Sequence, residues 1–145
     1  MLKILLPTDG SDYAYKAGEY AINAIEGANI IILYVISTEQ LNKLHHRELR
    51  VALKKELEEE GERVVNKFRK RIEDNLCQGH CEKVTFTSLI KEGNPAEVIT
   101  KTIEEEDIDH VIMGKSGKKG MDKLYLGSTT EKVIRKANIP VTVIS

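Results

Sequence analysis

The sequence lacks any appreciable net charge and any long apolar run. Its 145 residues include 22 Lys and Arg against 23 Asp and Glu, which gives a formal net charge of -1 at pH 7. This balance excludes an overall field that would attract nucleic acid or an acidic membrane surface. No run approaches the roughly 20 apolar residues of a membrane span, and the apolar start at Leu2–Leu6 is too short for a signal-peptide core. We therefore expect a cytoplasmic protein that binds neither nucleic acid nor membrane.

Cysteine is scarce as well, with only Cys77 and Cys81. In the cytoplasm both thiols are expected to be reduced, so they cannot serve as a structural staple. With His80 between them they offer three metal ligands within five residues. Structural zinc usually takes four ligands, and no second pair stands at a typical spacing, so we predict no metal site.

What the sequence does contain is a set of short apolar runs. The runs at 2–6, 30–36, 111–113 and 140–144 are mostly rich in Ile and Val, which favours strands buried on both faces of a sheet. A fifth run, 84–90, mixes apolar residues with Thr and Ser and indicates a half-exposed strand near an edge.

Helical patterns separate these runs. Ser11, Asn94 and Ser128 each precede an apolar stripe at helical spacing and are predicted to cap its start, Ser128 in a capping box with Glu131. Between 41 and 76 we predict a loop or short helix, followed by one long and largely solvated helix that Gly61 interrupts.

Strands that alternate with helices are typical of βαβ units, whose crossovers are right-handed in ~98 % of cases. The length is close to the commonest size of one domain. We therefore predict a single α/β domain over residues 1–145, with a five-stranded, parallel, doubly wound sheet. It would be of the Rossmann-like or flavodoxin-like kind, with strand order 3-2-1-4-5 and helices on both faces. Ligands of such sheets bind beyond the carboxyl ends of the strands.

Two loops that leave predicted strands carry unusual chemistry. Asp9 follows the first strand, where a carboxylate can accept hydrogen bonds from ribose, although the segment also fits a simple strand-to-helix turn. The second loop, 114–130, has glycines that let backbone amides converge on an anion, four lysines, and a helix amino end at Ser128. That combination suits a polyphosphate, while its lysines and Ser128 also fit ordinary solvated and capping positions.

The glycine spacing carries a family resemblance. The pattern Gly114-x2-Gly117-x9-Gly127-Ser128 matches the G-x2-G-x9-G-[ST] pattern of the universal stress protein family, in its ATP-binding branch. Leu5-Leu6-Pro7-Thr8-Asp9-Gly10-Ser11 resembles that family's opening strand and turn. Further similarities lie at 32–36, 92–95, 109–114 and 139–143, whereas 38–82 has no recognisable match.

The resemblance implies that the protein binds ATP together with Mg²⁺. It implies that the adenosine is contacted by Pro7, Thr8, Asp9, Val35, Met113 and Gly114. It implies that the phosphates are contacted by Gly117, Gly127, Ser128 and Thr129. Lys115 is counted with the nucleotide-binding residues, but Lys115-Ser116 replaces the Ser-His or Ser-Arg pair of many members, which leaves the roles of these two open.

The C-terminal strand indicates a homodimer. The apolar segment 140–145 would leave a hydrophobic edge that invites pairing with a second copy, and the resemblance implies the same arrangement.

Three functions stay open at this point. The first is a regulatory, stress-responsive ATP-binding protein with slow or no hydrolysis and an unidentified protein partner. The second is an enzyme of the adenylate-forming, ATP-pyrophosphatase type, but such enzymes carry their glycine-rich signature in the first loop rather than the fourth. The third is a nucleotide-free dimeric scaffold. We assign no catalytic residue, because no His or Glu in these loops is placed as a base for water, so the chain is at most a weak ATPase.

Overall fold

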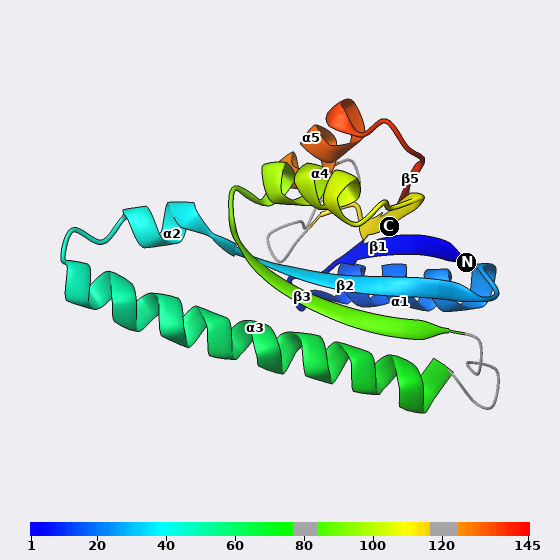
Figure 1. The fold of residues 1–145 in the computed structure, drawn as a ribbon, viewed down its shortest axis with the longest axis horizontal. Coiled ribbons are helices and arrows are strands. Elements are labelled where there is room, and N and C mark those ends of the chain that lie inside the picture. The colour runs from blue at the N-terminus through cyan, green and yellow to red at the C-terminus, as the bar shows by residue number, and fades with distance from the viewer. Residues whose placement is uncertain (77–83, 117–124) are drawn as a thin grey trace.

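The computed structural model describes residues 1–76, 84–116 and 125–145. Its elements, in chain order, are β1 (Leu2–Pro7), α1 (Asp12–Ala24), β2 (Ala28–Ser37), α2 (Thr38–Asn42), α3 (Arg47–Leu76), β3 (Thr85–Gly93), α4 (Pro95–Glu105), β4 (His110–Gly114), α5 (Ser128–Lys136) and β5 (Val141–Ile144). The strands form one parallel sheet in the order β3-β2-β1-β4-β5, which confirms the predicted fold and strand order. Helices α1 and α3 lie on one side of this sheet and α4 and α5 on the other (Figure 1).

The central strands β1, β2 and β4 are buried on both faces because each carries a continuous apolar run. Ile4 and Leu6 face a core formed with α1 and α3, whereas Leu5, between them, faces a second core formed with α4 and α5. All three side chains are fully buried. Full burial of such a side chain contributes about 1.5–3 kcal/mol, so the alternation along one strand holds three layers together.

The long helix α3 packs on the sheet and on α1 through one stripe that includes Val65, Phe68 and Ile72. Small residues make this contact close. A Cβ built on Gly18 of α1 would lie 2.7 Å from Phe68 Cζ. Helix α3 is continuous through Gly61, so the predicted interruption there is wrong. Gly61 is glycine for another reason, because a Cβ at this position would lie 2.7 Å from Cδ1 of the Tyr34 ring.

Two of the three predicted helix caps are confirmed. Ser11 Oγ accepts a hydrogen bond from Ala14 N at 3.3 Å, and Asn94 Oδ1 accepts one from Glu97 N at 3.3 Å. The capping box at Ser128 is wrong, since Gly127 holds the N-cap position and Ser128 is the first residue inside α5. Gly127 has no side chain, so no side-chain cap bond forms at this helix start.

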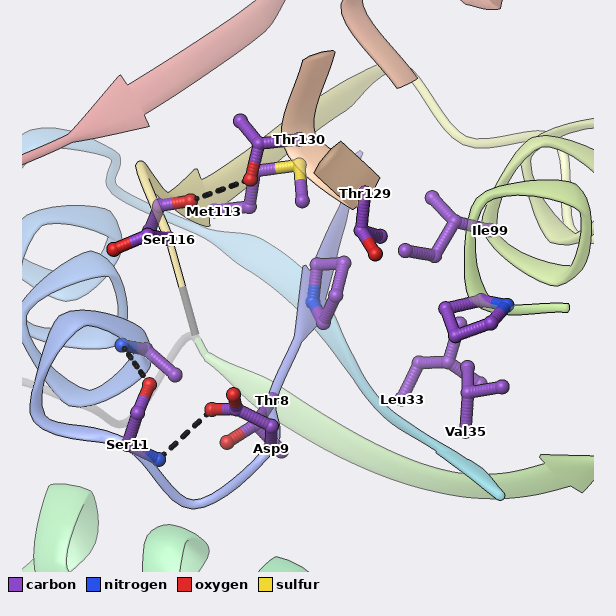
Figure 2. A pocket seen from close by; sticks show the side chains of 14 residues that line it. Thr8, Asp9, Ser11, Leu33, Val35, Ile99, Met113, Ser116, Thr129 and Thr130 are labelled. Carbon is purple, nitrogen blue, oxygen red and sulfur yellow. Dashed lines mark hydrogen bonds between the residues drawn. The ribbon is translucent and has the colours of Figure 1, made fainter. Parts of the chain in front are cut away.

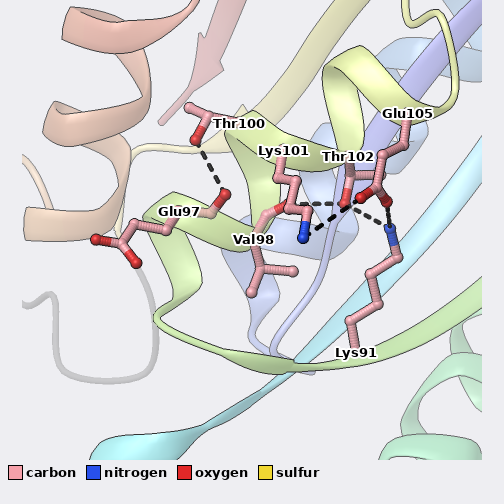
Figure 3. Close-up of polar contacts among 7 residues, drawn as sticks. All are labelled: Lys91, Glu97, Val98, Thr100, Lys101, Thr102 and Glu105. Carbon is pink, nitrogen blue, oxygen red and sulfur yellow. Dashed lines mark hydrogen bonds and ion pairs between the residues drawn. The ribbon is translucent and has the colours of Figure 1, made fainter.

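A polar network on β3 fixes the position of α4 against the sheet (Figure 3). Lys91 Nζ donates to Thr102 Oγ1 and to Glu105 Oε2, both at 3.0 Å. The Thr102 hydroxyl in turn donates to Val98 O at 2.7 Å. Thr102 is fully buried, so these bonds satisfy a hydroxyl that would otherwise lie unpaired in the interior. The network therefore holds α4, whose start lines the cavity described below.

The two edges of the sheet are the partly exposed strands β3 and β5. The edge position predicted for the fifth apolar run is thus confirmed, although β3 extends to Gly93 because its pairing with β2 continues to Ser37. Within the described part of the chain, no helix is both long and apolar enough to cross a membrane. Cys77, His80 and Cys81 lie outside the described residues, so the absence of a metal site there stays a prediction.

Candidate functional site

A cavity of about 230 Å³ opens at the carboxyl ends of β1, β2 and β4. The chain order reverses between β1 and β4, which is the place where doubly wound sheets bind ligands. Figure 2 shows the side chains around it. The cavity is lined by Pro7, Thr8, Asp9, Ser11, Ala14, Leu33, Val35, Pro95, Ile99, Met113, Gly114, Ser116, Thr129 and Thr130.

The turn after β1 holds Asp9 at the cavity. Thr8 N donates to Leu33 O at 2.8 Å, which continues the pairing with β2 one residue past the strand. Asp9 Oδ1 then accepts a hydrogen bond from Ser11 N at 2.9 Å, and Gly10 N donates to Thr8 Oγ1 at 3.2 Å. Gly10 has φ +83, a backbone conformation that glycine adopts without steric cost. These local bonds fix the carboxylate just beyond the strand, as the sequence predicts.

Helix α3 packs against the turn that follows β1. A Cβ on Gly10 would lie 3.4 Å from both methyl groups of Val64. The Tyr34 ring packs against Gly61 of the same helix, and burial, together with the negative charges of Glu60 and Asp9, raises the pKa of Tyr34 above its ordinary value. The residues that position Asp9 therefore include side chains of a helix that does not itself line the cavity.

The loop between β4 and α5 is closed at its base. Lys115 N donates to Ile144 O and Gly127 N donates to Lys115 O, each at 2.8 Å. Thr130 Oγ1 donates to Gly114 O at 3.0 Å, a bond drawn in Figure 2. The start of α5 is thereby tied to the end of β4, with Thr129 and Thr130 of its first turn lining the cavity.

Two glycines of the predicted motif are required by close packing. A Cβ on Gly114 would lie 2.7 Å from Tyr13 Cβ and 2.9 Å from the Tyr13 carbonyl carbon, at the start of α1. A Cβ on Gly127 would lie 3.1 Å from Ser116 Cα. The glycines thus bring the starts of α1 and α5 close to the end of β4, which shapes the cavity from two sides.

The structure brings together most of the residues that the sequence assigned to a nucleotide. Those that line the cavity are Pro7, Thr8, Asp9, Val35, Met113, Gly114 and Thr129. Gly127 is buried beside it, Ser128 is exposed and outside the lining, and Gly117 lies outside the described residues. Lys115 also lies outside the lining, with Nζ 5.8 Å from the centroid of the Tyr13 ring.

Sequence reasoning missed the apolar wall formed by Leu33, Pro95 and Ile99, and left Ser116 without a role. Leu33 and Ile99 appear in the sequence as ordinary core residues, and Pro95 as a helix start. The signal that could have found them is position relative to the carboxyl edge of the sheet. Leu33 pairs with Pro7 at the end of β1, Pro95 begins α4, and Ile99 lies one turn further along that helix. Ser116 lines the cavity and is 5 % exposed, and its buried Oγ has no hydrogen-bond partner among the residues that the structure describes.

Comparison with known proteins agrees with this geometry. All of residues 1–145 match the model of the Universal stress protein family. The chain belongs to the universal stress protein family. It is 36 % identical over 137 residues to a universal stress protein of Methanothermobacter thermautotrophicus, covering 93 % of this chain and 89 % of that protein. Its fold is similar to the solved structure of MJ0577 of Methanocaldococcus jannaschii, with TM-score 0.83 and 33 % identity over 99 % of this chain and 94 % of that one.

More distant solved structures share the fold and hold ligands. A universal stress protein family protein from Arabidopsis thaliana, solved with AMP bound, has TM-score 0.65 and 17 % identity over 99 % of this chain and 91 % of that one. A universal stress protein in complex with cAMP has TM-score 0.59 and 16 % identity over 99 % of this chain and 96 % of that one. At these identities the likeness is one of fold.

Proposed function

We propose that this universal stress protein binds ATP, with Mg²⁺ carried by the nucleotide, in the cavity at the carboxyl edge of its sheet. The observation that supports this most strongly is that one cavity combines Asp9 with the first turn of α5. A carboxylate accepts several hydrogen bonds and suits ribose hydroxyls. Backbone amides at a helix start suit phosphate. The two groups match the two polar parts of a nucleotide.

The rest of the lining fits the remaining part, the base. Leu33, Val35 and Ile99 provide an apolar wall of the kind on which small-molecule sites are built. The volume of about 230 Å³ lies slightly below the roughly 300–1,000 Å³ typical of drug-sized ligands. The described walls therefore suit the nucleoside, with the phosphates extending past the start of α5. AMP and cAMP in two structures of this fold support an adenine nucleotide as the ligand class.

The metal would arrive with the nucleotide. In the described ranges no group of three or more His, Cys, Asp or Glu side chains is arranged to hold a metal ion. Mg²⁺ is commonly bound by substrate phosphates and water with few protein ligands, so a cavity with a single carboxylate fits this mode.

We propose that the nucleotide is held for regulation rather than consumed. Asp9 is the single ionisable side chain among the described residues that line the cavity, and its place beside the β1 turn assigns it to the sugar. In that described lining no second group stands ready to take a proton from water, so we expect hydrolysis to be slow or absent. Nucleotide occupancy would then alter the surface of a homodimer, paired along β5, that a protein partner recognises.

The direct test is to identify what the purified protein carries. The protein is denatured, and the released small molecules are identified by mass spectrometry. We expect ATP or another adenine nucleotide near one per chain. Protein that carries none, and takes up none when incubated with ATP and Mg²⁺, would favour the nucleotide-free scaffold.

A further inference from the structure

Another cavity, of about 320 Å³, lies between α2, the start of α3 and the end of β3. Its wall includes three cationic side chains, one carboxylate and two apolar side chains, which are Arg47, Arg50, Lys54, Glu92, Leu41 and Val51. We call this surface the α2–α3 groove. None of these residues lines the cavity proposed for the nucleotide, so the groove is a separate surface.

The groove is formed where α2 and the start of α3 extend beyond the strands of the sheet (Figure 1). From Gly61 onward, one face of α3 is buried, as Val65 and Phe68 show. Between residues 47 and 60 no side chain of this helix is buried. Arg50 and Lys54 lie on the same helix face as Gly61, because whole turns of about 3.6 residues separate them. The face that packs on the sheet therefore becomes cationic where the helix passes the end of the sheet.

Arg47 and Arg50 have no acidic neighbour along their own helix. No Asp or Glu stands three or four residues from either arginine, the spacings at which helical side chains meet. Arg50 instead stands between Arg47 and Lys54, and like charges at these spacings repel one another. Lys54 pairs with Glu92 at 3.0 Å, whereas neither arginine makes an ion pair or a side-chain hydrogen bond within the part of the chain that the structure describes. Both guanidinium groups are therefore open to a carboxylate from outside the chain.

The neighbouring charges limit which anion the groove can accept. An adjoining cavity further along α3 is lined by Glu58 and Glu62, in addition to side chains shared with the groove. A long polyanion such as nucleic acid would be repelled by these carboxylates, and the whole chain has a formal net charge of only -1. A short acidic segment of a protein would not extend that far.

The chemistry of the wall suits such a segment. The planar guanidinium of arginine matches a carboxylate through two parallel hydrogen bonds. Leu41 and Val51 offer contact for an apolar residue placed between the acidic ones. Arginine beside apolar side chains, with few other charges, is also the composition that is enriched in protein interfaces.

We propose that the α2–α3 groove binds an acidic segment of a partner protein, whose carboxylates pair with Arg47 and Arg50 and whose apolar side chain contacts Val51. This docking surface goes beyond the proposed function, because it lies outside the nucleotide site and gives the chemistry of the partner. All of its wall except Glu92 belongs to the segment 38–82, where the family resemblance is absent.

The test is an NMR titration of the isotope-labelled protein with the end-blocked peptide Glu-Glu-Leu-Glu-Glu. The amide signals of Arg47, Arg50 and Glu92 should shift, whereas those of Thr8 and Gly114 at the nucleotide cavity should not. A peptide with Gln in place of every Glu should bind at least about fivefold more weakly, and added NaCl should weaken binding of the acidic peptide. Unshifted groove signals, or equal binding of the Gln peptide, would overturn the proposal.

A pair of double variants locates the contact. Arg47→Gln with Arg50→Gln should weaken binding of the acidic peptide about 5- to 25-fold, as expected for the loss of two partly exposed ion pairs. Arg63→Gln with Lys67→Gln is the matched control, because both residues are exposed on α3 and the net charge changes equally. The control should bind as the parent does, and equal weakening in both double variants would contradict the groove. The comparison of the two peptides on the parent decides the proposal even if a variant folds poorly.

Two results would assign the groove to another occupant and overturn the acidic segment. One is a short oligothymidylate that binds as tightly as the peptide and shifts the same signals. The other is a parent that is dimeric by light scattering, while Arg47→Gln with Arg50→Gln is monomeric, since a second copy would then occupy the groove. Failure of ATP to bind would leave this proposal standing, and failure of the peptide to bind would leave the nucleotide site standing.

Discussion

Gly61 of α3 lies against the ring of Tyr34 on β2, so close that a Cβ on Gly61 would come within 2.7 Å of ring carbon Cδ1. The contact joins the longest helix to the strand whose end lines the cavity. It also explains a glycine in the middle of a helix, where glycine is normally unfavourable by about 1 kcal/mol relative to alanine.

We expect Gly61→Ala to destabilise the protein, although alanine has the higher helix propensity. Propensity alone would stabilise α3 by about 1 kcal/mol, whereas the added methyl group must displace the Tyr34 ring, and such overpacking typically costs about 1–3 kcal/mol. The free energy of unfolding from urea denaturation should therefore fall. Adding Tyr34→Leu to Gly61→Ala should recover part of the loss. A more stable Gly61→Ala variant would show that the ring does not confine this position.

Two substitutions of Asp9 test its contact with the sugar, and only Asp9→Asn keeps the hydrogen bond from Ser11 N that holds the turn. Asp9→Ala should weaken ATP binding about 10- to 100-fold, because it removes a charged hydrogen-bond partner. Asp9→Asn is the matched control, since its side-chain oxygen can still accept from Ser11 N. Asp9→Asn should also lower the pKa of Tyr34, which the Asp9 charge helps to raise. The ATP affinity of each variant is measured by calorimetry, and the pKa of Tyr34 is measured by NMR titration. Unchanged ATP affinity in Asp9→Ala would remove Asp9 from the site.

The network on β3 predicts a titration effect. The hydrogen bond and charge of Lys91 lower the pKa of Glu105, with Lys101 a lesser cause. Because the folded pKa is depressed, the stabilisation is present above the unfolded value of about 4.3 and is lost as pH falls through the folded value. Lys91→Met should return the pKa of Glu105 toward its ordinary value, as followed by NMR of its carboxyl carbon. Lys101→Met should raise the pKa of Glu105 less than Lys91→Met does. A larger increase in Lys101→Met would contradict Lys91 as the main cause.

Strand β5 allows a test of the dimer that spares the sheet. Val111 N donates to Pro140 O, and Lys115 N donates to Ile144 O. The backbone groups of even-numbered residues in 140–144 are therefore directed toward β4, whereas the Val143 N–H is directed toward the open edge of the sheet. Val143→Pro should block pairing with a second copy while the bonds to β4 stay intact. Light scattering at micromolar concentration should give a dimer for the parent and for Val143→Thr, and a monomer for Val143→Pro. A monomeric parent would refute the dimer.

The fold could be predicted from the sequence because most of its strands can be recognised by their local composition. Continuous apolar runs such as Leu2–Leu6 and caps such as Asn94 are local signals, and the structure uses them as predicted. The roles of Gly61 and Ser128 differ from those predicted because they depend on neighbours in the tertiary structure. Gly61 is required by the Tyr34 ring on β2. The N-cap position expected for Ser128 is held by Gly127.

The residues of the site likewise separate into those predictable from local sequence and those that depend on tertiary neighbours. Asp9 follows β1, Gly114 ends β4, and both could be placed from the motif. Ile99 and Ser116 line the cavity only because α4 and the end of β4 converge there. No spacing rule along the chain encodes that convergence.

The most direct test of the central claim is a calorimetric titration of nucleotide-stripped parent protein with ATP and Mg²⁺, combined with a phosphate-release assay on the same sample. We expect saturable binding near one ATP per chain, with phosphate release well below about 1 per second, the lower end of typical enzyme turnover. Absence of ATP binding would contradict the nucleotide site, and turnover at or above that rate would contradict a protein that holds ATP for regulation.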